Sequence, residues 1–201
     1  MKPGMRNNMK KLILSVLSVL IFCTLLTSCG DVGYTEDEIR ETAKNLIESS
    51  YEINEIYFGE GLPVTGEDSV GSRLYTPVTD DCKYHSTSEI KAATEKVYTA
   101  DYCKILFKTG FEGTSLESEE NVRYARFIDD FDGRLTARKD LAESAITRGR
   151  TFDYDSAEIV KMKKDRAEIT YITHVDGEKD LSVTVTLLKD ESGWRLDTPT
   201  Y

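Results

Sequence analysis

The sequence predicts an α+β fold in which N-terminal helices pack on an antiparallel β-sheet. Three observations support this fold class. Apolar residues recur at helical spacing between positions 35 and 110. From Val122 onward apolar and polar residues alternate, which is the period of a β-strand. Short turns such as Asp132-Gly133 and Asp176-Gly177 separate the alternating runs, so we expect hairpins to join successive strands.

The first 28 residues have the features of a secretion signal. Four basic residues precede an uncharged run of fifteen, Leu12 to Leu26, which is shorter than the roughly 20 apolar residues that a membrane-spanning helix needs. The run ends in Leu26-Thr27-Ser28-Cys29, which resembles the lipobox of bacterial lipoproteins. In proteins with that pattern the cysteine receives a diacylglycerol and becomes the new N-terminus. We therefore expect lipid attachment at Cys29 and a protein on the extracytoplasmic face of the cell membrane; an ordinary signal peptide or an uncleaved anchor is the alternative.

The charge of the chain restricts its partners. The whole chain has 26 basic and 36 acidic residues. Residues 1–28 hold four of the basic residues and none of the acidic ones, so their removal leaves 22 basic and 36 acidic residues, a net charge of −14 over 173 residues. Such a domain is repelled by nucleic acid and by anionic lipid, so the lipid must hold it at the membrane. A partner with a basic surface would be attracted.

After a short tether over residues 29–34, we expect residues 35–201 to form a single domain that begins with three helices. Thr35 and Glu38 form a capping box for the first helix, and Gly59 can end it. Ser86 with Glu89 begins the second helix, and Thr99 begins a third that Gly110 ends. The stripe expected to be buried on the first helix consists of Ile39, Ala43, Leu46, Ser50, Ile53 and Tyr57.

Residues 59–85 are rich in Gly, Pro and Asp and are expected to form a loop. Within them, Leu62 to Gly66 matches the LPxTG pentapeptide that sortases cut. A sorting signal needs a following apolar stretch and a basic tail at the C-terminus, whereas a long polar chain follows here. We therefore interpret these five residues as a turn.

The second half of the domain is expected to be a series of antiparallel strands. Residues 139–156 are ambiguous, with a helical turn possible over 141–146. The alternation of apolar and polar residues predicts a hairpin of two strands, over 122–129 and 134–138, and a further strand over 157–162. Two longer strands follow, one with the apolar or inward positions Ala167, Ile169, Tyr171 and Thr173 and one with Leu181, Val183, Val185 and Leu187. The last strand is expected over 194–197.

Two cysteines, Cys82 and Cys103, remain in the domain. A disulfide between them is permitted outside the cytoplasm and would stabilise the fold by about 3 kcal/mol. Two buried free thiols are an equally good interpretation. A catalytic cysteine paired with His85 or His174 is a third, but no cysteine-protease signature surrounds either cysteine.

The sequence contains no motif of an established catalytic, cofactor or metal site. There is no Walker loop, GxGxxG, GxSxG or HExxH pattern. Asp129 to Gly133 partly resembles a calcium loop, but Ile128 stands where the first ligand is needed, so we interpret it as an acidic hairpin tip. We therefore expect no catalytic residue, cofactor or metal.

Helices followed by long antiparallel strands that end in Gly-Trp-Arg-Leu-Asp resemble the nuclear transport factor 2-like cone, in which a curved sheet wraps the helices around a pocket. The chain also resembles clostridial extracytoplasmic lipoproteins, many of them related to the IseA family of cell-wall DL-endopeptidase inhibitors. The resemblance spans most of residues 35–201, and none of its residues can be assigned an inhibitory role. It is carried by Tyr57 to Val64, Tyr75 to Val78, Ser88 to Lys91 and Val97 to Tyr102.

Together these features predict a membrane-anchored, non-catalytic binding module. The resemblance implies that its partner is a cell-wall hydrolase. The alternative is a small-ligand receptor whose pocket is lined by Tyr171 and Trp194, although both residues also fit simple core packing. A third hypothesis is an enzyme on the same fold, which would need an Asp–His or Tyr pair in the pocket.

Overall fold

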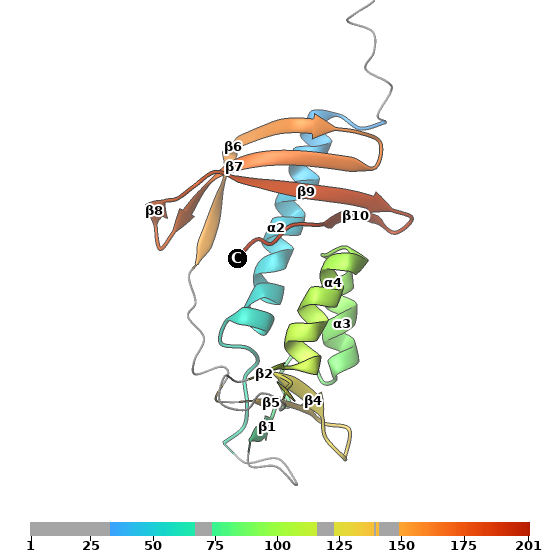
Figure 1. Cartoon of the computed structure of the whole chain (residues 1–201), viewed down its shortest axis with the longest axis vertical. Helices are drawn as coiled ribbons and strands as arrows, with labels where there is room; N and C mark the ends of the chain where they lie inside the picture. Colours follow the sequence, from blue (N-terminus) through green and yellow to red (C-terminus); the bar gives the residue numbers. More distant parts are fainter. Residues whose placement is uncertain (1–32, 67–73, 116–122, 139, 141–148) are drawn as a thin grey trace, which may run out of the picture. The chain divides into compact units, whose positions relative to one another are not determined.

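The computed structural model describes residues 33–66, 74–115, 123–138, 140 and 149–201. Residues Glu36–Tyr201 form one compact unit (Figure 1). The predicted signal segment, Cys29 and the possible helical turn over 141–146 lie outside the described residues. Within the described ranges, no helix is long and apolar enough to cross a membrane.

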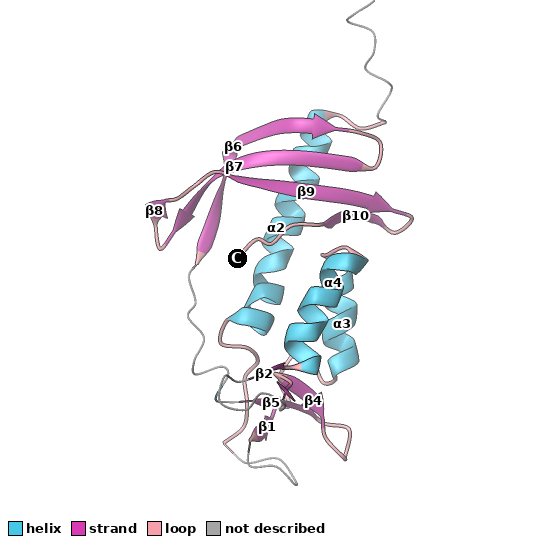
Figure 2. Cartoon of the chain, viewed as in Figure 1, coloured by secondary structure: helices cyan, strands magenta, loops and turns pink. Residues whose placement is uncertain are grey.

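The main sheet is an antiparallel meander, as the alternating pattern predicts. It consists of β6 (Arg150–Met162), β7 (Arg166–Val175), β9 (Val183–Asp190) and β10 (Gly193–Leu196) in the order β10-β9-β7-β6, and the short strand β8 (Glu178–Lys179) pairs with the end of β7. The strands form open sheets together with helices, which confirms the α+β class (Figure 2).

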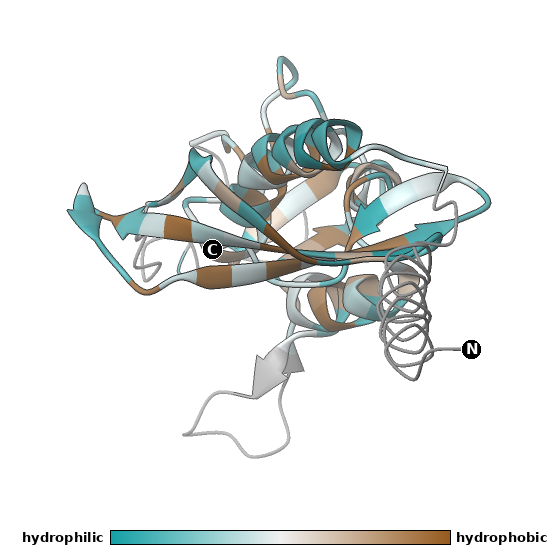
Figure 3. Ribbon diagram, turned by 90° about the horizontal axis from the view of Figure 1, so that it is seen from above, coloured by the Kyte–Doolittle hydropathy of each residue, from teal (hydrophilic) through white to brown (hydrophobic). Residues whose placement is uncertain are grey.

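The long helix α2 (Glu36–Phe58) packs against this sheet, contacting β6 and β10 (Figure 1). Five of the six residues of the predicted stripe are buried; Leu46 is half-buried, and its neighbour Ile47 takes its place in the core. Along the long strands apolar residues alternate with polar ones (Figure 3). In β7 the buried residues are those predicted from the sequence: Ala167, Ile169, Tyr171 and Thr173.

The strands do not all belong to one meander, because some of them form a second, smaller sheet. It consists of β1 (Tyr75–Pro77), β5 (Leu135–Arg138) and β4 (Phe127–Asp129), with β5 in the centre. The predicted hairpin around Asp132-Gly133 is therefore confirmed as β4–β5, but it pairs with β1 from the expected loop and not with the main sheet. A two-stranded ladder joins β2 (Thr114–Ser115) to β3 (Arg123–Tyr124).

The LPxTG-like segment is extended, so its interpretation as a turn is wrong. Val64 forms an antiparallel bridge with Val78. The amide of Thr65 donates to the carbonyl of Pro77 (2.8 Å), and the amide of Thr79 donates to that of Pro63 (3.0 Å). Backbone pairing with the residues around β1 holds this segment in place.

Two helices, α3 (Thr87–Glu95) and α4 (Ala100–Phe107), pack on each other and begin at the predicted caps. The Ser86 side chain accepts from the amide of Glu89, and the Thr99 side chain accepts from the amide of Tyr102. The end predicted at Gly110 is wrong, because a π-helical turn, η1 (Lys108–Glu112), continues to Gly113. Gly113 has φ +83° and ψ 161°, a backbone conformation that is open almost only to glycine.

Candidate functional site

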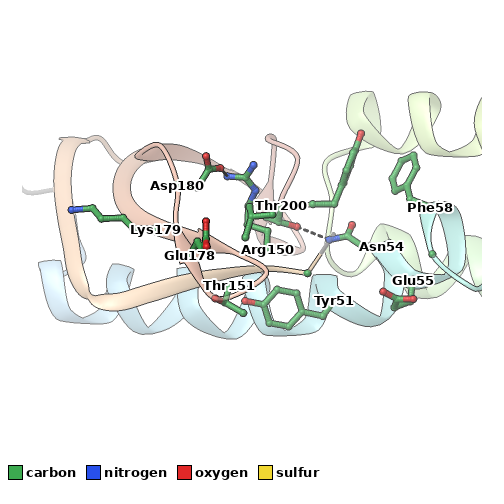
Figure 4. Close-up of a pocket in the computed structure, with 14 residues that line it drawn as sticks. Tyr51, Asn54, Glu55, Phe58, Arg150, Thr151, Glu178, Lys179, Asp180 and Thr200 are labelled. Carbon is green, nitrogen blue, oxygen red and sulfur yellow. Dashed lines mark hydrogen bonds and ion pairs between the residues drawn. The ribbon is translucent and has the colours of Figure 1, made fainter. Parts of the chain in front are cut away.

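A pocket of about 870 Å³ opens between the C-terminal half of α2, the start of β6, the β7–β8 hairpin and the last residues of the chain (Figure 4). Its volume lies in the range of small-molecule and peptide sites. These walls come from four segments that are far apart in the sequence. The pocket therefore exists only once α2 has packed on the sheet.

A buried hydrogen-bond network forms one wall of the pocket and fixes the C-terminal segment to α2. Asn54 Nδ2 donates to Thr200 Oγ1 (2.9 Å), and the Tyr98 hydroxyl donates to Asn54 Oδ1 (2.9 Å). The hydroxyls of Ser50 and Thr200 are 2.6 Å apart. Burial raises the pKa of Tyr98, although its hydrogen bonds to these groups oppose the shift. Because these polar atoms are paired with one another, the wall is held in one arrangement.

Aromatic rings supply the apolar surface of the pocket. The rings of Phe58 and Tyr201 are stacked with centroids 4.0 Å apart and an interplanar angle of 31°. Tyr51 also lines the pocket, and its hydroxyl lies 3.4 Å from that of Tyr154. About half of Tyr201 is exposed. These rings can therefore pack against an apolar or planar group that enters the pocket.

Charged groups of both signs line the remaining wall. Arg150 Nη1 lies 3.2 Å from a carboxylate oxygen of Asp180 and donates to Thr173 Oγ1 at 3.0 Å. Glu55 approaches from α2, while Glu178 and Lys179 come from β8. A ligand with both amine and carboxylate or amide groups, such as a peptide segment, matches this lining.

Neither histidine belongs to the pocket. The residues that line it include no His, Cys or Ser. His85 is exposed, and its backbone amide donates to Glu89 Oε2 (2.7 Å). His174 lies in β7, opposite Thr151 and Lys179 in the strand register. The Asp–His pair named by the enzyme hypothesis is therefore not among the residues that line this pocket, whereas two tyrosines, Tyr51 and Tyr201, are.

Tyr171 and Trp194 lie in the core, which corrects their assignment to a pocket. Tyr171 is 1% exposed and Trp194 is 9% exposed, and neither lines the pocket. The ring of Tyr171 packs edge-on against Phe152 and Tyr154, and burial raises its pKa to about 12. Both residues therefore belong to the core, which was the alternative interpretation.

Sequence reasoning did not identify the residues that do line the pocket. Asn54 follows the buried Ile53 on α2. Its position as a polar residue beside an apolar stripe was the signal in the sequence that could have pointed to the pocket. Ser50, which belongs to the predicted stripe, was a second signal, because a buried hydroxyl needs a partner. The partner that both share, Thr200, lies about 150 residues further along the chain.

Cys82 and Cys103 are both buried free thiols, so the structure holds the unbridged alternative and not the disulfide. The Cys103 thiol lies 3.6 Å from the carbonyl oxygen of Tyr98 and can donate to it. Burial, with the nearby carboxylate of Glu95, raises the pKa of Cys103 to about 11. A thiol in this state is a poor nucleophile near neutral pH.

We expect Cys103 to resist alkylation while the protein is folded. At pH 8 a pKa of about 11 leaves only about one thiol in a thousand ionised. Iodoacetamide labelling followed by peptide mass spectrometry should show at least about 100-fold slower modification than in denaturant. Thiol titration in denaturant without reductant should detect both cysteines. A disulfide would leave both undetected, which would contradict the structure.

No protein-family model matches this chain, and no curated protein matches it.

Proposed function

We propose that the protein is a lipid-anchored, extracytoplasmic binding module that performs no chemistry of its own. The pocket beside α2 is the observation that carries this proposal. It combines ligand-sized volume, stacked aromatic rings and charges of both signs, and its lining residues include no His, Cys or Ser. Such a lining suits recognition of a ligand.

The partner we propose is a cell-wall DL-endopeptidase, which the module inhibits by binding. The resemblance of several segments to IseA-related lipoproteins supports this class of partner. The chemistry of the pocket agrees with it, because a surface loop of an enzyme offers the amine and carboxylate groups that Glu178, Lys179 and Arg150 can pair with. The net charge of −14 expected after signal removal would favour a partner with a basic surface.

A small-ligand receptor is the second candidate, and the volume of the pocket favours it. About 870 Å³ would hold a short peptide without any larger partner. Peptide fragments of the cell wall carry amine and carboxylate groups together, so the same lining would serve them. The two candidates therefore differ in the size of the ligand and share its chemistry.

Replacing Thr151 with tryptophan tests the pocket in both cases. Thr151 is exposed on β6 and lines the pocket, so an indole at this position would fill part of the cavity. We expect Thr151→Trp to weaken binding by at least about 10-fold. Thr184→Trp is the matched control, because Thr184 is also an exposed threonine of the same sheet but does not line the pocket.

Calorimetry should compare a purified DL-endopeptidase with soluble wall peptides as ligands of the chain. Tight binding of the endopeptidase that Thr151→Trp weakens and Thr184→Trp leaves unchanged would support the inhibitor. Binding of the wall peptides with the same sensitivity would support the receptor instead. Binding of neither ligand, or equal binding by both variants, would reject the role proposed for the pocket.

A further inference from the structure

The tip of the β4–β5 hairpin exposes an aromatic side chain to solvent. Phe131 is 98% exposed, the highest value among the large apolar residues that the structure describes. The five other phenylalanines in the described ranges are buried or half-buried and pack against aromatic rings: Phe58, Phe107, Phe111, Phe127 and Phe152. Phe131 therefore gains nothing for the fold from its apolar surface, and burial of that ring would be favourable in a complex.

Hydrogen bonds hold the tip in one conformation. Asp130 Oδ1 accepts from the amides of Asp132 and Arg134, each at 2.9 Å. The amide of Asp130 donates to the carbonyl of Arg134 (2.9 Å), and Gly133 takes the left-handed φ of +76° that closes the turn. Because the turn is fixed before any contact, a partner would not have to order it on binding.

A second set of contacts fixes the hairpin to the start of α3. The Asp129 carboxylate accepts from the amide of Thr87 (2.9 Å) and from its hydroxyl (2.7 Å). Ile128 and Asp129 pair with Thr136 and Leu135 across the hairpin. The phenyl ring of Phe131 is thus presented by a supported turn and not by a loose loop.

Acidic residues on both sides of Phe131 in the sequence define the chemistry of its partner. Asp130 and Asp132 flank Phe131 in the sequence, and Asp132 is exposed. The nearby cation, Arg134, lies 3.7 Å from the carboxylate of Asp80. An anionic membrane surface would repel this tip, while a site bordered by Lys or Arg would attract it.

We propose that Phe131 inserts into an apolar pocket bordered by Lys or Arg side chains on a partner protein. This inference rests on the proposed function, because it assigns a second contact, separate from the pocket beside α2, to the same endopeptidase. The ring supplies the buried anchor, and the carboxylates of Asp130 and Asp132 pair with the cations around it.

The test uses the full chain in cells, with benzoylphenylalanine placed at position 131 and, as a control, at position 160. Val160 is a suitable control site, because it is 60% exposed on β6 and does not line the pocket beside α2. We expect a discrete protein adduct from position 131 and none from position 160. Mass spectrometry should map the adduct to an apolar surface beside Lys or Arg, and Asp132→Lys should reduce its yield. No protein adduct at 131, or lipid adducts only, would overturn the inference.

A second measurement separates failure of this inference from failure of the proposed function. Phe131→Ser should weaken binding of the purified DL-endopeptidase by about 30-fold or more, while Val160→Ser should change it by less than about twofold. Unchanged binding by Phe131→Ser would overturn the inference and leave the inhibitor intact. A mapped adduct on a basic, apolar site of a different protein would support the inference and reject the endopeptidase as the partner.

Discussion

Replacing Cys29 with alanine should release the protein from the membrane fraction while leaving the domain folded. The diacylglycerol expected on this thiol places two acyl chains in the bilayer, and each buried methylene contributes about 0.8 kcal/mol. Charge would not hold the domain at an anionic membrane surface, because the domain expected after signal removal has a net charge of −14. Cell fractionation with immunoblotting measures the effect.

Cys23→Ala is the matched control for this experiment. Cys23 lies within the apolar run of the signal and not at the lipobox cysteine, so membrane retention should be unchanged. If Cys29→Ala still partitions with membranes, and mass spectrometry of the native N-terminus finds no lipid, the apolar segment is an uncleaved anchor and the lipoprotein hypothesis is wrong.

Gly113→Ala should destabilise the domain more than an ordinary glycine substitution does. A Cβ at this position would lie 2.3–2.6 Å from backbone atoms of Tyr124, and the residue has φ +83°. Backbone cannot rotate away as a side chain can, so the β2–β3 ladder would have to separate. We expect the free energy of unfolding in urea to fall by at least about 3 kcal/mol.

Gly133→Ala separates the steric clash from the backbone conformation. Gly133 has φ +76°, but a Cβ there would meet no atom within 4 Å. Only the cost of the left-handed conformation remains, about 1 kcal/mol. Equal losses of stability for the two variants would show that Tyr124 does not lie against Gly113.

Local signals in the sequence were enough to predict several elements. The caps at Ser86 and Thr99 depend on contacts within four residues, and both are present. The alternation around Ile169 reflects one buried face of a strand, and the buried residues are the predicted ones. The end of α4 was misplaced, because Gly110 packs its backbone against the ring of Tyr57, and that contact lies far away in the sequence.

Long-range pairing explains the other differences. Tyr75 pairs with Arg138 in the small sheet, and Val64 forms an isolated bridge with Val78, so segments that look like loops have paired backbones. Leu181 continues the alternating pattern but lies outside β9 and is exposed. Composition and the period of apolar residues could not distinguish a paired strand from a loop in these segments.

The site was harder to predict than the fold for the same reason. Tyr171 has the pattern of an inward-facing strand residue, and such residues serve cores and pockets equally well. The pocket depends instead on where Thr200 meets Asn54 and where Arg150 meets Asp180. Only the folded arrangement brings these groups together.

The central proposal is that this chain binds and inhibits a cell-wall hydrolase without catalysing a reaction itself. The most direct measurement is the release of peptides from purified cell wall by a DL-endopeptidase, titrated with the purified chain. We predict that activity falls to near zero at about one chain per enzyme, that the chain is recovered intact, and that the chain alone releases no peptide. Full endopeptidase activity in the presence of excess chain, or peptide release by the chain alone, would contradict the claim.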